Sequence, residues 1–496
     1  IVSLSGCAEV PEDYPEEFYY IEQDTNEFDD FYKTVIRNGE PLTVYKGENI
    51  VLAINKETFD VKEYVYKQSS LIGKIYDLAT GYMIVNVNVF DYSHSYDESN
   101  YNKLKEENYI VELVNISDYI EDAELKEWYD LYPEKFNNKT NGITQRRWLL
   151  NANPLLAEFI TKRIGHGWEK DLTKLKGLEK FVDDDESLTE LINIKMENKQ
   201  VLSDFLKHTQ NEFLDPESIF DVQVKRLHEY KRQLLNILHV MYLYNRLVED
   251  PDYNPPARTF IFGAKAASGY RRAKTIIKLI NTVAERINND RRVRGKIRVV
   301  FVENYRVSVA EKIFPAADVS EQISTAGYEA SGTSNMKFMV NGALTLGTMD
   351  GANIEIVEEA GKENAFVFGH LTEEIKQMER EHSYNPQQYL DSNPALARVV
   401  EQLVDGTYDP THQIFKELYD SLVYGVEGQR ADVYYVLADF DSYCKAQERI
   451  AAEYMDKKLW AKKTLINIAN SGKFSSDRTI EDYVRDIWKI KKLEVK

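Results

Sequence analysis

The sequence predicts an α/β protein built on a doubly wound, Rossmann-like parallel sheet, followed by helices and preceded by a small β-rich module. Three short, mainly apolar segments at residues 219–224, 258–263 and 297–302 are typical of parallel strands that are covered on both faces. Longer segments with apolar residues at helical spacing separate them. This alternation of strand and helix predicts right-handed crossovers and therefore a parallel sheet.

The composition is that of a globular protein with several domains. The chain has 496 residues, 43% hydrophobic and 29% charged, which is enough for two to four domains with buried cores. Its formal net charge of −20 argues against general binding to nucleic acid. Two cysteines cannot form a disulfide framework, and no apolar segment is long enough to cross a bilayer. We predict no metal site.

Residues 1–30 read as an acidic leader. The first 112 residues contain 22 acidic and 9 basic side chains, a net charge of −13. Residues 4–7, L-S-G-C, resemble a lipobox, in which Cys7 would be acylated after cleavage of a signal peptide. The charged and apolar regions that precede a lipobox are not in the sequence, so a chance match in a tail is an equal alternative. We expect a cytoplasmic protein, with a lipoprotein anchored through Cys7 as the alternative.

Residues 31–112 predict the small β-rich module. Apolar and polar residues alternate at 42–66 and at 73–91, which indicates strands, and residues 109–114 add one more. The module has no metal-ligand spacing, no nucleophile motif and no phosphate loop. We therefore assign no chemistry to it.

Residues 113–496 contain the predicted sheet and the candidate chemistry. The strand at 219–224 ends at Lys225-Arg226, and Lys231-Arg232 follow where a helix begins. Open α/β sheets bind ligands at the carboxyl ends of their strands. Arginine offers a bidentate fork, and lysine a point charge, to phosphate groups. The alternative is a solvated basic helix start. We interpret His228, in the same loop, as structural.

The later strands continue the same pattern. The strand at 297–302 leads to Tyr305 and Arg306 at its carboxyl end. Residues 343–346 and 354–357 predict two further strands, one on each side of an Asp-Gly turn. Helical patterns then dominate to the carboxyl end of the chain.

Residues 327–337 read G-Y-E-A-S-G-T-S-N-M-K and precede an apolar run at 338–346. Glycine and serine let a backbone approach a ligand and expose its N–H groups. Lys337, at the edge of the apolar run, is a candidate for the lowered pKa that Schiff-base chemistry requires. From pattern alone, the alternative is a Gly/Ser-rich loop that ends in a solvated lysine.

Four blocks in one order resemble the α-glucan phosphorylases, the family of the glycogen, starch and maltodextrin phosphorylases. They read N-N-K-T-N-G-I-T-Q-R-R-W at 137–148, F-D-V-Q-V-K-R-L-H-E-Y-K-R-Q-L-L-N at 220–236, V-E-N-Y-R-V-S-V-A-E-K at 302–312, and E-A-S-G-T-S-N-M-K-F-M-V-N-G-A-L-T-L-G-T-M-D-G-A-N-I-E at 329–355. The match covers about residues 113–496 and is similar to the carboxy-terminal half of the family. It implies the second half of a glycosyltransferase-B fold.

The resemblance also implies a cofactor, pyridoxal 5′-phosphate, held by Lys337 as a Schiff base. The implied catalytic residues are Lys337, Arg226 and Lys231, of which the last two hold the substrate phosphate. The implied cofactor pocket further contains Lys225, Tyr305, Arg306, Gly332, Thr333 and Trp148. The implied ligands of the glucosyl unit are Asn141, Glu329, Ser331 and Gly332.

The implied reaction is the phosphorolysis of terminal α-1,4-glucosyl units of a glucan by inorganic phosphate, which yields glucose 1-phosphate. In the family, the cofactor phosphate relays a proton to the glycosidic oxygen while phosphate attacks the anomeric carbon with retention. Such a site needs a cationic clamp, a positioned cofactor and a closed cleft. We do not recognise the family's amino-terminal half of the cleft in residues 1–122. We therefore expect an incomplete active site in this chain.

Three interpretations follow. The chain is a phosphorylase carboxy-terminal half joined to a foreign leader, or a phosphorylase completed by another chain, or a lipid-anchored binding protein that is not an enzyme. The intact Lys337, Arg226 and Lys231 argue against the third, and we favour the first. The expected protein partner is a second copy of the chain, as in a homodimer, or a separate amino-terminal half.

Overall fold

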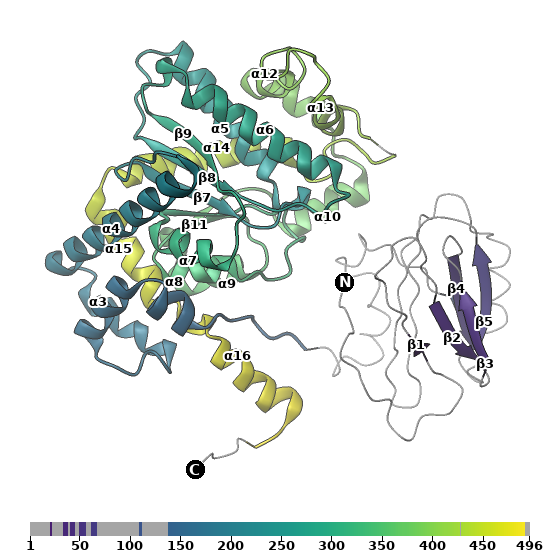
Figure 1. The fold of residues 1–496 in the computed structure, drawn as a ribbon, viewed down its shortest axis with the longest axis horizontal. Coiled ribbons are helices and arrows are strands. Elements are labelled where there is room, and N and C mark those ends of the chain that lie inside the picture. Colours follow the sequence, from purple (N-terminus) through teal and green to yellow (C-terminus); the bar gives the residue numbers. More distant parts are fainter. Residues whose placement is uncertain are drawn as a thin grey trace. The chain divides into compact units, whose positions relative to one another are not determined.

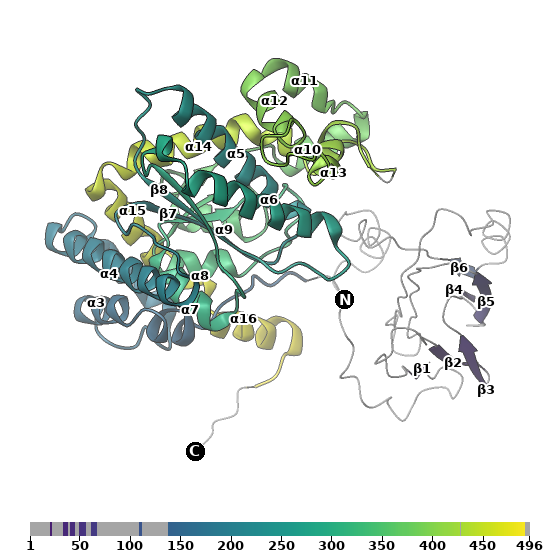
Figure 2. The same cartoon turned by 45° about the horizontal axis from the view of Figure 1, so that its top comes forward.

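The computed structural model describes residues 137–426 and 428–491, together with the backbone of six short strands nearer the amino terminus (Figures 1 and 2). The chain divides into two units, residues 1–133 and 134–496. Cys7 and the acidic leader around it lie outside the described residues, apart from one two-residue strand.

The strands of the first unit are antiparallel and form two three-stranded sheets, in the orders β1-β2-β3 and β5-β4-β6. Their bounds are Tyr20–Ile21 (β1), Lys33–Arg37 (β2), Glu40–Val44 (β3), Asn49–Asn55 (β4), Val61–Tyr66 (β5) and Tyr109–Val111 (β6). Strands therefore occur within the predicted segments 42–66 and 109–114. The segment at 73–91 lies outside the described residues.

The second unit is built on a six-stranded, all-parallel sheet with the order β12-β11-β10-β7-β8-β9. The strands are Ile219–Val224 (β7), Arg258–Gly263 (β8), Ile297–Phe301 (β9), Val319–Gln322 (β10), Leu344–Gly347 (β11) and Phe366–Val367 (β12). The predicted doubly wound parallel sheet is confirmed.

The order of the strands contains one reversal. The chain adds β8 and then β9 on one side of β7, and it returns to place β10 on the other side, with Val319 opposite Asp221. Because the crossovers leave β7 and β10 in opposite directions, a crevice opens beyond their carboxyl ends. This switch point is the expected position of a ligand site.

Helices cover both faces of the sheet (Figure 1). One face is covered mainly by α5 (Gln233–Glu249), α6 (Arg271–Asn288) and α14 (Val436–Tyr454). The other is covered by α3 (Pro154–Ile164), α4 (Asp185–Gln210), α7 (Val307–Ala316), α8 (Ser334–Val340), α9 (Ala352–Ala360) and α15 (Lys457–Ala469).

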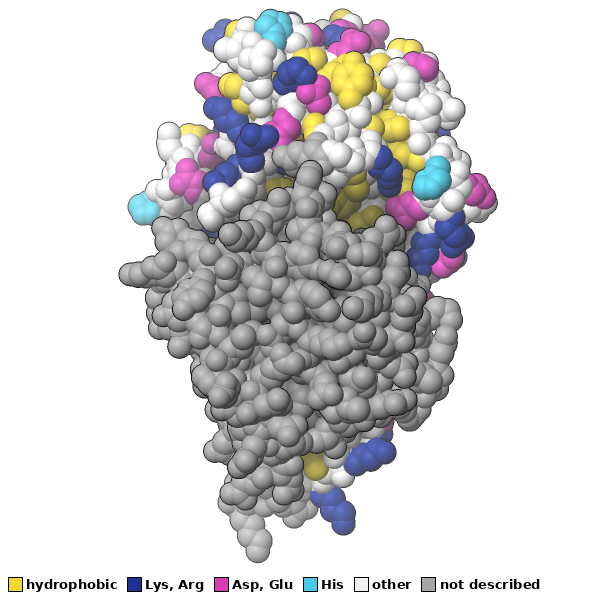
Figure 3. Space-filling view, turned by 90° about the vertical axis from the view of Figure 1, so that its right-hand side faces the viewer, with side chains coloured by type: hydrophobic (Ala, Val, Ile, Leu, Met, Phe, Trp, Pro, Cys, Tyr) yellow, Lys and Arg dark blue, Asp and Glu magenta, His cyan; other side chains and the backbone are white. Residues whose placement is uncertain are grey.

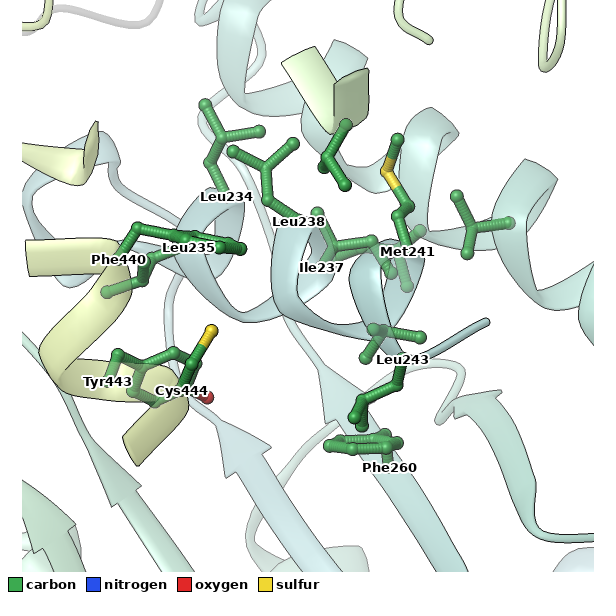
Figure 4. Close-up of a cluster of buried hydrophobic side chains, with 14 of the residues drawn as sticks. Leu234, Leu235, Ile237, Leu238, Met241, Leu243, Phe260, Phe440, Tyr443 and Cys444 are labelled. Carbon is green, nitrogen blue, oxygen red and sulfur yellow. The ribbon is translucent and has the colours of Figure 1, made fainter. Parts of the chain in front are cut away.

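Side chains along each strand alternate between the two cores, as the period of two requires. In β8, Phe260 and Phe262 enter the core under α5, whereas Ile261 enters the opposite core. Figure 4 shows the first core, where Leu238 on α5 and Phe440 on α14 lie in the same cluster as Phe260. Both faces of the sheet are therefore buried, which explains why its strands are mainly apolar.

One predicted strand is wrong. Residues 354–357 lie within helix α9, whereas the neighbouring prediction at 343–346 is confirmed by β11. The buried residues of α9 include Ala352, Ile356 and Ala360, which recur every four residues and form one helical face. The short I-E-I-V segment fits either period, so periodicity alone could not distinguish a helix from a strand.

The carboxy-terminal region is helical, as predicted. Besides α14 and α15 it contains α10 (Thr372–Glu381), α11 (Pro386–Ser392), α12 (Pro394–Glu401), α13 (Lys416–Val423) and α16 (Ser476–Tyr483). None of the helices in the described residues has the length and apolarity needed to cross a membrane. On the face that Figure 3 shows, the visible Lys and Arg side chains lie among acidic and hydrophobic ones and form no continuous basic surface.

A buried ion pair connects α4 to the amino ends of β7 and β10. The Lys199 ammonium donates to Asp318 Oδ2 at 2.7 Å, and the two side chains are 0% and 2% exposed. Lys199 also donates to the Ser218 carbonyl at 2.6 Å, and the Phe220 N–H donates to Asp318 at 2.8 Å. Both charges are therefore satisfied by several partners, which a buried pair needs in order to be tolerated.

Replacing Lys199 by methionine is expected to lower the free energy of unfolding by about 3–5 kcal/mol, because the Asp318 carboxylate would stay buried without its partner. Urea denaturation followed by circular dichroism measures the change. Arg246→Met is the control, since Arg246 pairs with Glu448 at the surface, where a pair contributes at most about 1 kcal/mol. Equal, small losses in the two variants would contradict the prediction.

Candidate active site

The candidate site lies at the switch point of the sheet. Lys225 and Arg226 directly follow β7, and the 3₁₀ turn Glu229–Lys231 comes next. The loop after β10 runs alongside, because the Thr325 N–H donates to the Tyr230 carbonyl at 3.0 Å. Two segments about 100 residues apart in sequence are thus joined at the carboxyl edge of the sheet.

Lys225 is held at the base of this crevice. Its ammonium donates to Gln322 Oε1 at 2.8 Å, at the last residue of β10. The Gln322 amide nitrogen donates in turn to Ser320 Oγ at 2.9 Å, which orients the amide oxygen toward the lysine. Burial and then the nearby Lys231 charge lower the pKa of Lys225 to about 8. Lys225 therefore carries a positive charge that is only weakly neutralised by the protein.

Lys231 is paired with Glu329, so the structure joins a predicted phosphate ligand to a predicted sugar ligand. The Tyr230 hydroxyl also donates to Glu329, at 3.3 Å. Burial opposes the charge on Lys231, but its hydrogen bonds to Glu329 and Tyr230 outweigh burial and raise its pKa. Lys231 therefore stays charged, and its ammonium can donate to an anion that enters the crevice.

The two arginines of the basic cluster differ in their surroundings. Arg226 is exposed, and none of the described residues accepts a hydrogen bond from its guanidinium. Arg232 is fully buried and pairs with Asp439 at 2.6 Å, and it donates to the Ile323 carbonyl at 2.7 Å. Arg232 thus fixes the start of α5 against α14 and the loop after β10, and it cannot reach a ligand in the crevice.

Lys337 lies on α8 in an aromatic pocket. Its ammonium is 3.9 Å from the centroid of the Trp148 ring and 5.8 Å from that of Phe314. The two rings meet edge to face with centroids 5.3 Å apart. Burial lowers the pKa of Lys337, which favours the neutral amine that attacks aldehydes. Trp148 forms one side of this pocket, and its part in a cofactor site stays a prediction.

The loop 327–333 is held in place by Asp350 and Gly351. Asp350 accepts hydrogen bonds from the Gly327 N–H at 3.0 Å and the Glu329 N–H at 2.9 Å. A Cβ atom at Gly351 would lie 2.3 Å from the Glu329 carbonyl oxygen, so only glycine permits this close approach. Gly332 has φ +90°, a conformation that other residues rarely adopt. Thr333 follows it, directly before α8.

Asn141 and Ser331, both predicted sugar ligands, lie together. The Asn141 side-chain amide donates to Ser331 Oγ at 3.0 Å across 190 residues of sequence. Thr140, next to Asn141, donates to Glu355 on α9 at 2.6 Å. The structure therefore places Asn141, Ser331 and Glu329 around one loop.

Tyr305 and Arg306 are placed at the carboxyl end of β9, before α7. Burial raises the pKa of Tyr305, whose Cβ and ring lie against Gly263 at the end of β8. Arg306 is exposed and donates to the Asn304 carbonyl at 3.3 Å. Both residues are on the ligand-binding edge, two strands away from β7. Their part in a cofactor pocket stays a prediction.

Sequence reasoning missed several residues of the site. Gln322 accepts a hydrogen bond from Lys225, and Tyr230 donates one to Glu329. Phe314 forms part of the Lys337 pocket. A glutamine at the end of an otherwise buried strand was a usable signal for Gln322. His228 lies against the rings of Tyr230 and Tyr270, with centroids 4.8 and 5.2 Å away, and burial lowers its pKa. This packing agrees with a structural role.

The residues present fit the implied cofactor. Lys337 offers a half-buried amine beside an aromatic ring, which suits a planar aldehyde. Lys225 offers a cation, and Gly332 lets the backbone approach closely, which suits a phosphate group. Among the described residues, no cluster of acidic, histidine or cysteine side chains could hold a metal ion.

Comparisons with known proteins give a consistent result. The model of the family described as carbohydrate phosphorylase matches residues 113–490. The chain is 51% identical over 375 residues to a glycogen phosphorylase of Bacillus subtilis, covering 76% of this chain and 46% of that protein. It is 51% identical over 381 residues to the liver form of Bos taurus and 49% identical over 373 residues to the muscle form of Oryctolagus cuniculus, covering 44% and 43% of those proteins. The chain thus spans less than half the length of these relatives.

Anion binding at the switch point is expected to weaken as the pH rises through about 8, because Lys225 then loses its proton. Sulfate is a suitable probe, since its charge is constant between about pH 7 and about pH 9.5 while a lysine with a lowered pKa titrates. Isothermal titration calorimetry measures the affinity. Lys225→Arg should bind sulfate with a flatter pH profile, because arginine keeps its charge. The same steep profile in both proteins would contradict the assignment.

Proposed function

Because this chain belongs to the carbohydrate phosphorylase family, we propose that it carries the part of an α-glucan phosphorylase site that binds pyridoxal phosphate, the substrate phosphate and the terminal glucosyl unit. The family resemblance of its motifs is confirmed by the match over residues 113–490, and the parallel sheet agrees with the predicted fold. The proposed reaction is the phosphorolysis of α-1,4-glucan to glucose 1-phosphate. A cytoplasmic location and a homodimer stay predictions.

One observation carries the proposal. A lysine with a lowered pKa lies in an aromatic pocket, on the helix that follows the loop of the switch point, where Lys225, Arg226 and Lys231 gather. Lys225 is a partly buried cation whose side-chain partner is a neutral amide, Lys231 has one carboxylate partner, and Arg226 is exposed, so the cluster can accept an anion. Two phosphate groups side by side, one from the cofactor and one from the substrate, would require such a cluster.

Each residue then has a role that follows from its surroundings. Lys337, whose ammonium lies 3.9 Å from the centroid of the Trp148 ring, would hold the cofactor covalently. Lys225, oriented by Gln322, would neutralise the cofactor phosphate. Arg226 would bind the substrate phosphate through two parallel hydrogen bonds of its guanidinium. Bound pyridoxal phosphate supplies a phosphate group that can donate and accept a proton next to the substrate phosphate.

The Lys231–Glu329 pair links phosphate binding to sugar binding. When Lys231 donates to a substrate phosphate, its hydrogen bond to Glu329 weakens. The Glu329 carboxylate then becomes a stronger acceptor for a sugar hydroxyl. Ser331 lies on the same loop as Glu329, and Asn141 donates to Ser331 Oγ at 3.0 Å from a distant segment. Asn141 and Ser331 would complete the hydrogen bonds to the glucosyl unit. Binding of the two substrates would therefore be mutually supportive at this pair.

We further propose that residues 113–490 supply the carboxy-terminal part of the family's cleft. The region that this chain shares with its relatives is less than half of their length. Lys337, Lys231 and Arg226 are all present and accessible, which disfavours the alternative of a binding protein without activity.

Pyridoxal phosphate is expected to attach to Lys337. Incubation with the cofactor, reduction with borohydride and peptide mass spectrometry should find the label on this residue, because its amine lies against the Trp148 ring and burial lowers its pKa. Lys337→Met should lose the label, whereas Lys312→Met should keep it, since Lys312 lies beside the Phe205 ring, outside the site. Labelling spread evenly over surface lysines would overturn the cofactor assignment.

Release of glucose 1-phosphate from maltodextrin and phosphate tests the proposed reaction. Release by the purified chain with the cofactor bound is expected to disappear in Lys337→Met, because this variant cannot hold the cofactor. Release that persists in Lys337→Met would overturn the proposed reaction. The labelling experiment and this assay thus test the cofactor site and the reaction separately.

A further inference from the structure

The carboxy-terminal helix α16 holds the segment that carries Asn141. Ile143 and Ser475 form a parallel β-bridge, in which the Ile143 N–H donates to the Phe474 carbonyl at 2.9 Å. A Cβ atom at Gly142 would lie 2.3 Å from the Ser475 carbonyl group, so the two backbones touch. Figure 1 shows α16 beside the segment that leads into the second unit. These contacts join residues that are more than 330 positions apart in the chain.

Arg478 is the centre of this contact. One of its terminal nitrogens donates to the Thr140 carbonyl at 2.9 Å and to the Asn141 carbonyl at 3.1 Å. The other terminal nitrogen pairs with Asp482 at 2.6 Å, and Nε donates to the Lys473 carbonyl at 2.8 Å. All three nitrogens of the guanidinium are therefore used, and the side chain is fixed in one orientation.

Two further bonds support the same segment. The Thr479 hydroxyl, one residue after Arg478, donates to the Thr140 carbonyl at 2.9 Å. The Thr140 hydroxyl donates to Glu355, which also pairs with Lys473 at 2.9 Å. Thr140 is thus fixed through both its backbone and its side chain, and Asn141 is the first residue beyond this anchor.

When the carbonyl groups on both sides of a Cα atom are fixed, the direction of its Cα–Cβ bond is fixed too. The Thr140 and Asn141 carbonyls flank the Cα atom of Asn141, and both accept from the same planar group. The Asn141 amide then points to Ser331 Oγ at 3.0 Å. Asn141 itself is exposed, so packing does not hold it in place.

We propose that Arg478 is a positioning residue, which orients Asn141 for the glucosyl unit by donating hydrogen bonds to the Thr140 and Asn141 carbonyls. This inference rests on the proposed function, because it assumes that Asn141 binds the sugar. It adds the carboxy-terminal helix to the substrate site, although Arg478 touches neither substrate nor cofactor. A lysine cannot replace it, since an ammonium lacks the planar fork that bonds Asp482, Lys473 and both carbonyls together.

The test measures binding of two ligands to the full chain with the cofactor attached. In Arg478→Met, the affinity for glucose 1-phosphate is expected to fall roughly tenfold, in line with the loss of charge-assisted hydrogen bonds. The affinity for inorganic phosphate should stay within about twofold, because additivity predicts little effect at the distant cationic cluster. Isothermal titration calorimetry gives both values. If Arg478 had a purely structural role, the variant would lose affinity for both ligands to a similar extent.

A double-mutant cycle shows whether Arg478 acts through Asn141. In the Asn141→Ala background, Arg478→Met should cause no further loss of affinity for glucose 1-phosphate, because the side chain it orients is gone. Arg478→Lys should recover less than half of the lost affinity. Arg146→Met is the matched control, since Arg146 also joins the same two segments, through Asp477 at 2.7 Å, but does not bond the Asn141 carbonyl. It should keep the wild-type affinity.

Cofactor labelling at Lys337 verifies that each variant is folded. Equal binding of glucose 1-phosphate by the wild type and Arg478→Met would overturn the inference. So would an equal loss in Arg146→Met, or a full additional loss in the Asn141→Ala background. A wild-type chain that takes up the cofactor and phosphate but not glucose 1-phosphate would overturn the proposed sugar site, and with it this inference.

Discussion

The parallel pairing of β7 with β10 is the constraint on which the rest of the second unit depends. These two strands are neighbours in space, yet two strands and three crossovers separate them in sequence. Their crossovers leave in opposite directions, so no helix can cover the space beyond their carboxyl ends. Lys225, the turn Glu229–Lys231 and the loop 327–333 all enter this space. The buried Lys199–Asp318 pair secures the opposite ends of the same two strands.

The site combines three lysines whose environments push their pKa values in different directions. Burial lowers the pKa of both Lys225 and Lys337, but Lys225 has a neutral amide partner, whereas Lys337 lies against aromatic rings. The carboxylate of Glu329 raises the pKa of Lys231 instead. Shifted pKa values gathered at one crevice are typical of functional sites. These shifts give the proposed cofactor and phosphate roles a physical basis.

The framework of the site extends beyond the sheet. The segment with Asn141 has no regular structure of its own, and it is held by α16 through backbone bonds and by Arg478. Arg232 performs a similar task for the loop after β10, where its buried pair with Asp439 ties α5 to α14. In both cases an arginine bonds several carbonyl groups at once, which its planar fork permits. Helices late in the chain therefore hold loops that carry the predicted ligands.

The sequence by itself determined the parallel sheet, most of its helices and the residues at the strand ends, because these depend on local periodicity and on motifs of adjacent residues. It could not decide residues 354–357, where a short apolar segment fits both periods. It grouped Arg232 with the basic cluster, although only the fold shows it buried against Asp439. The Lys231–Glu329, Lys225–Gln322 and Arg478–Asn141 contacts were likewise decided by the tertiary structure. Each joins residues about 100 or more positions apart, and no local pattern records which distant segments the folded chain brings together.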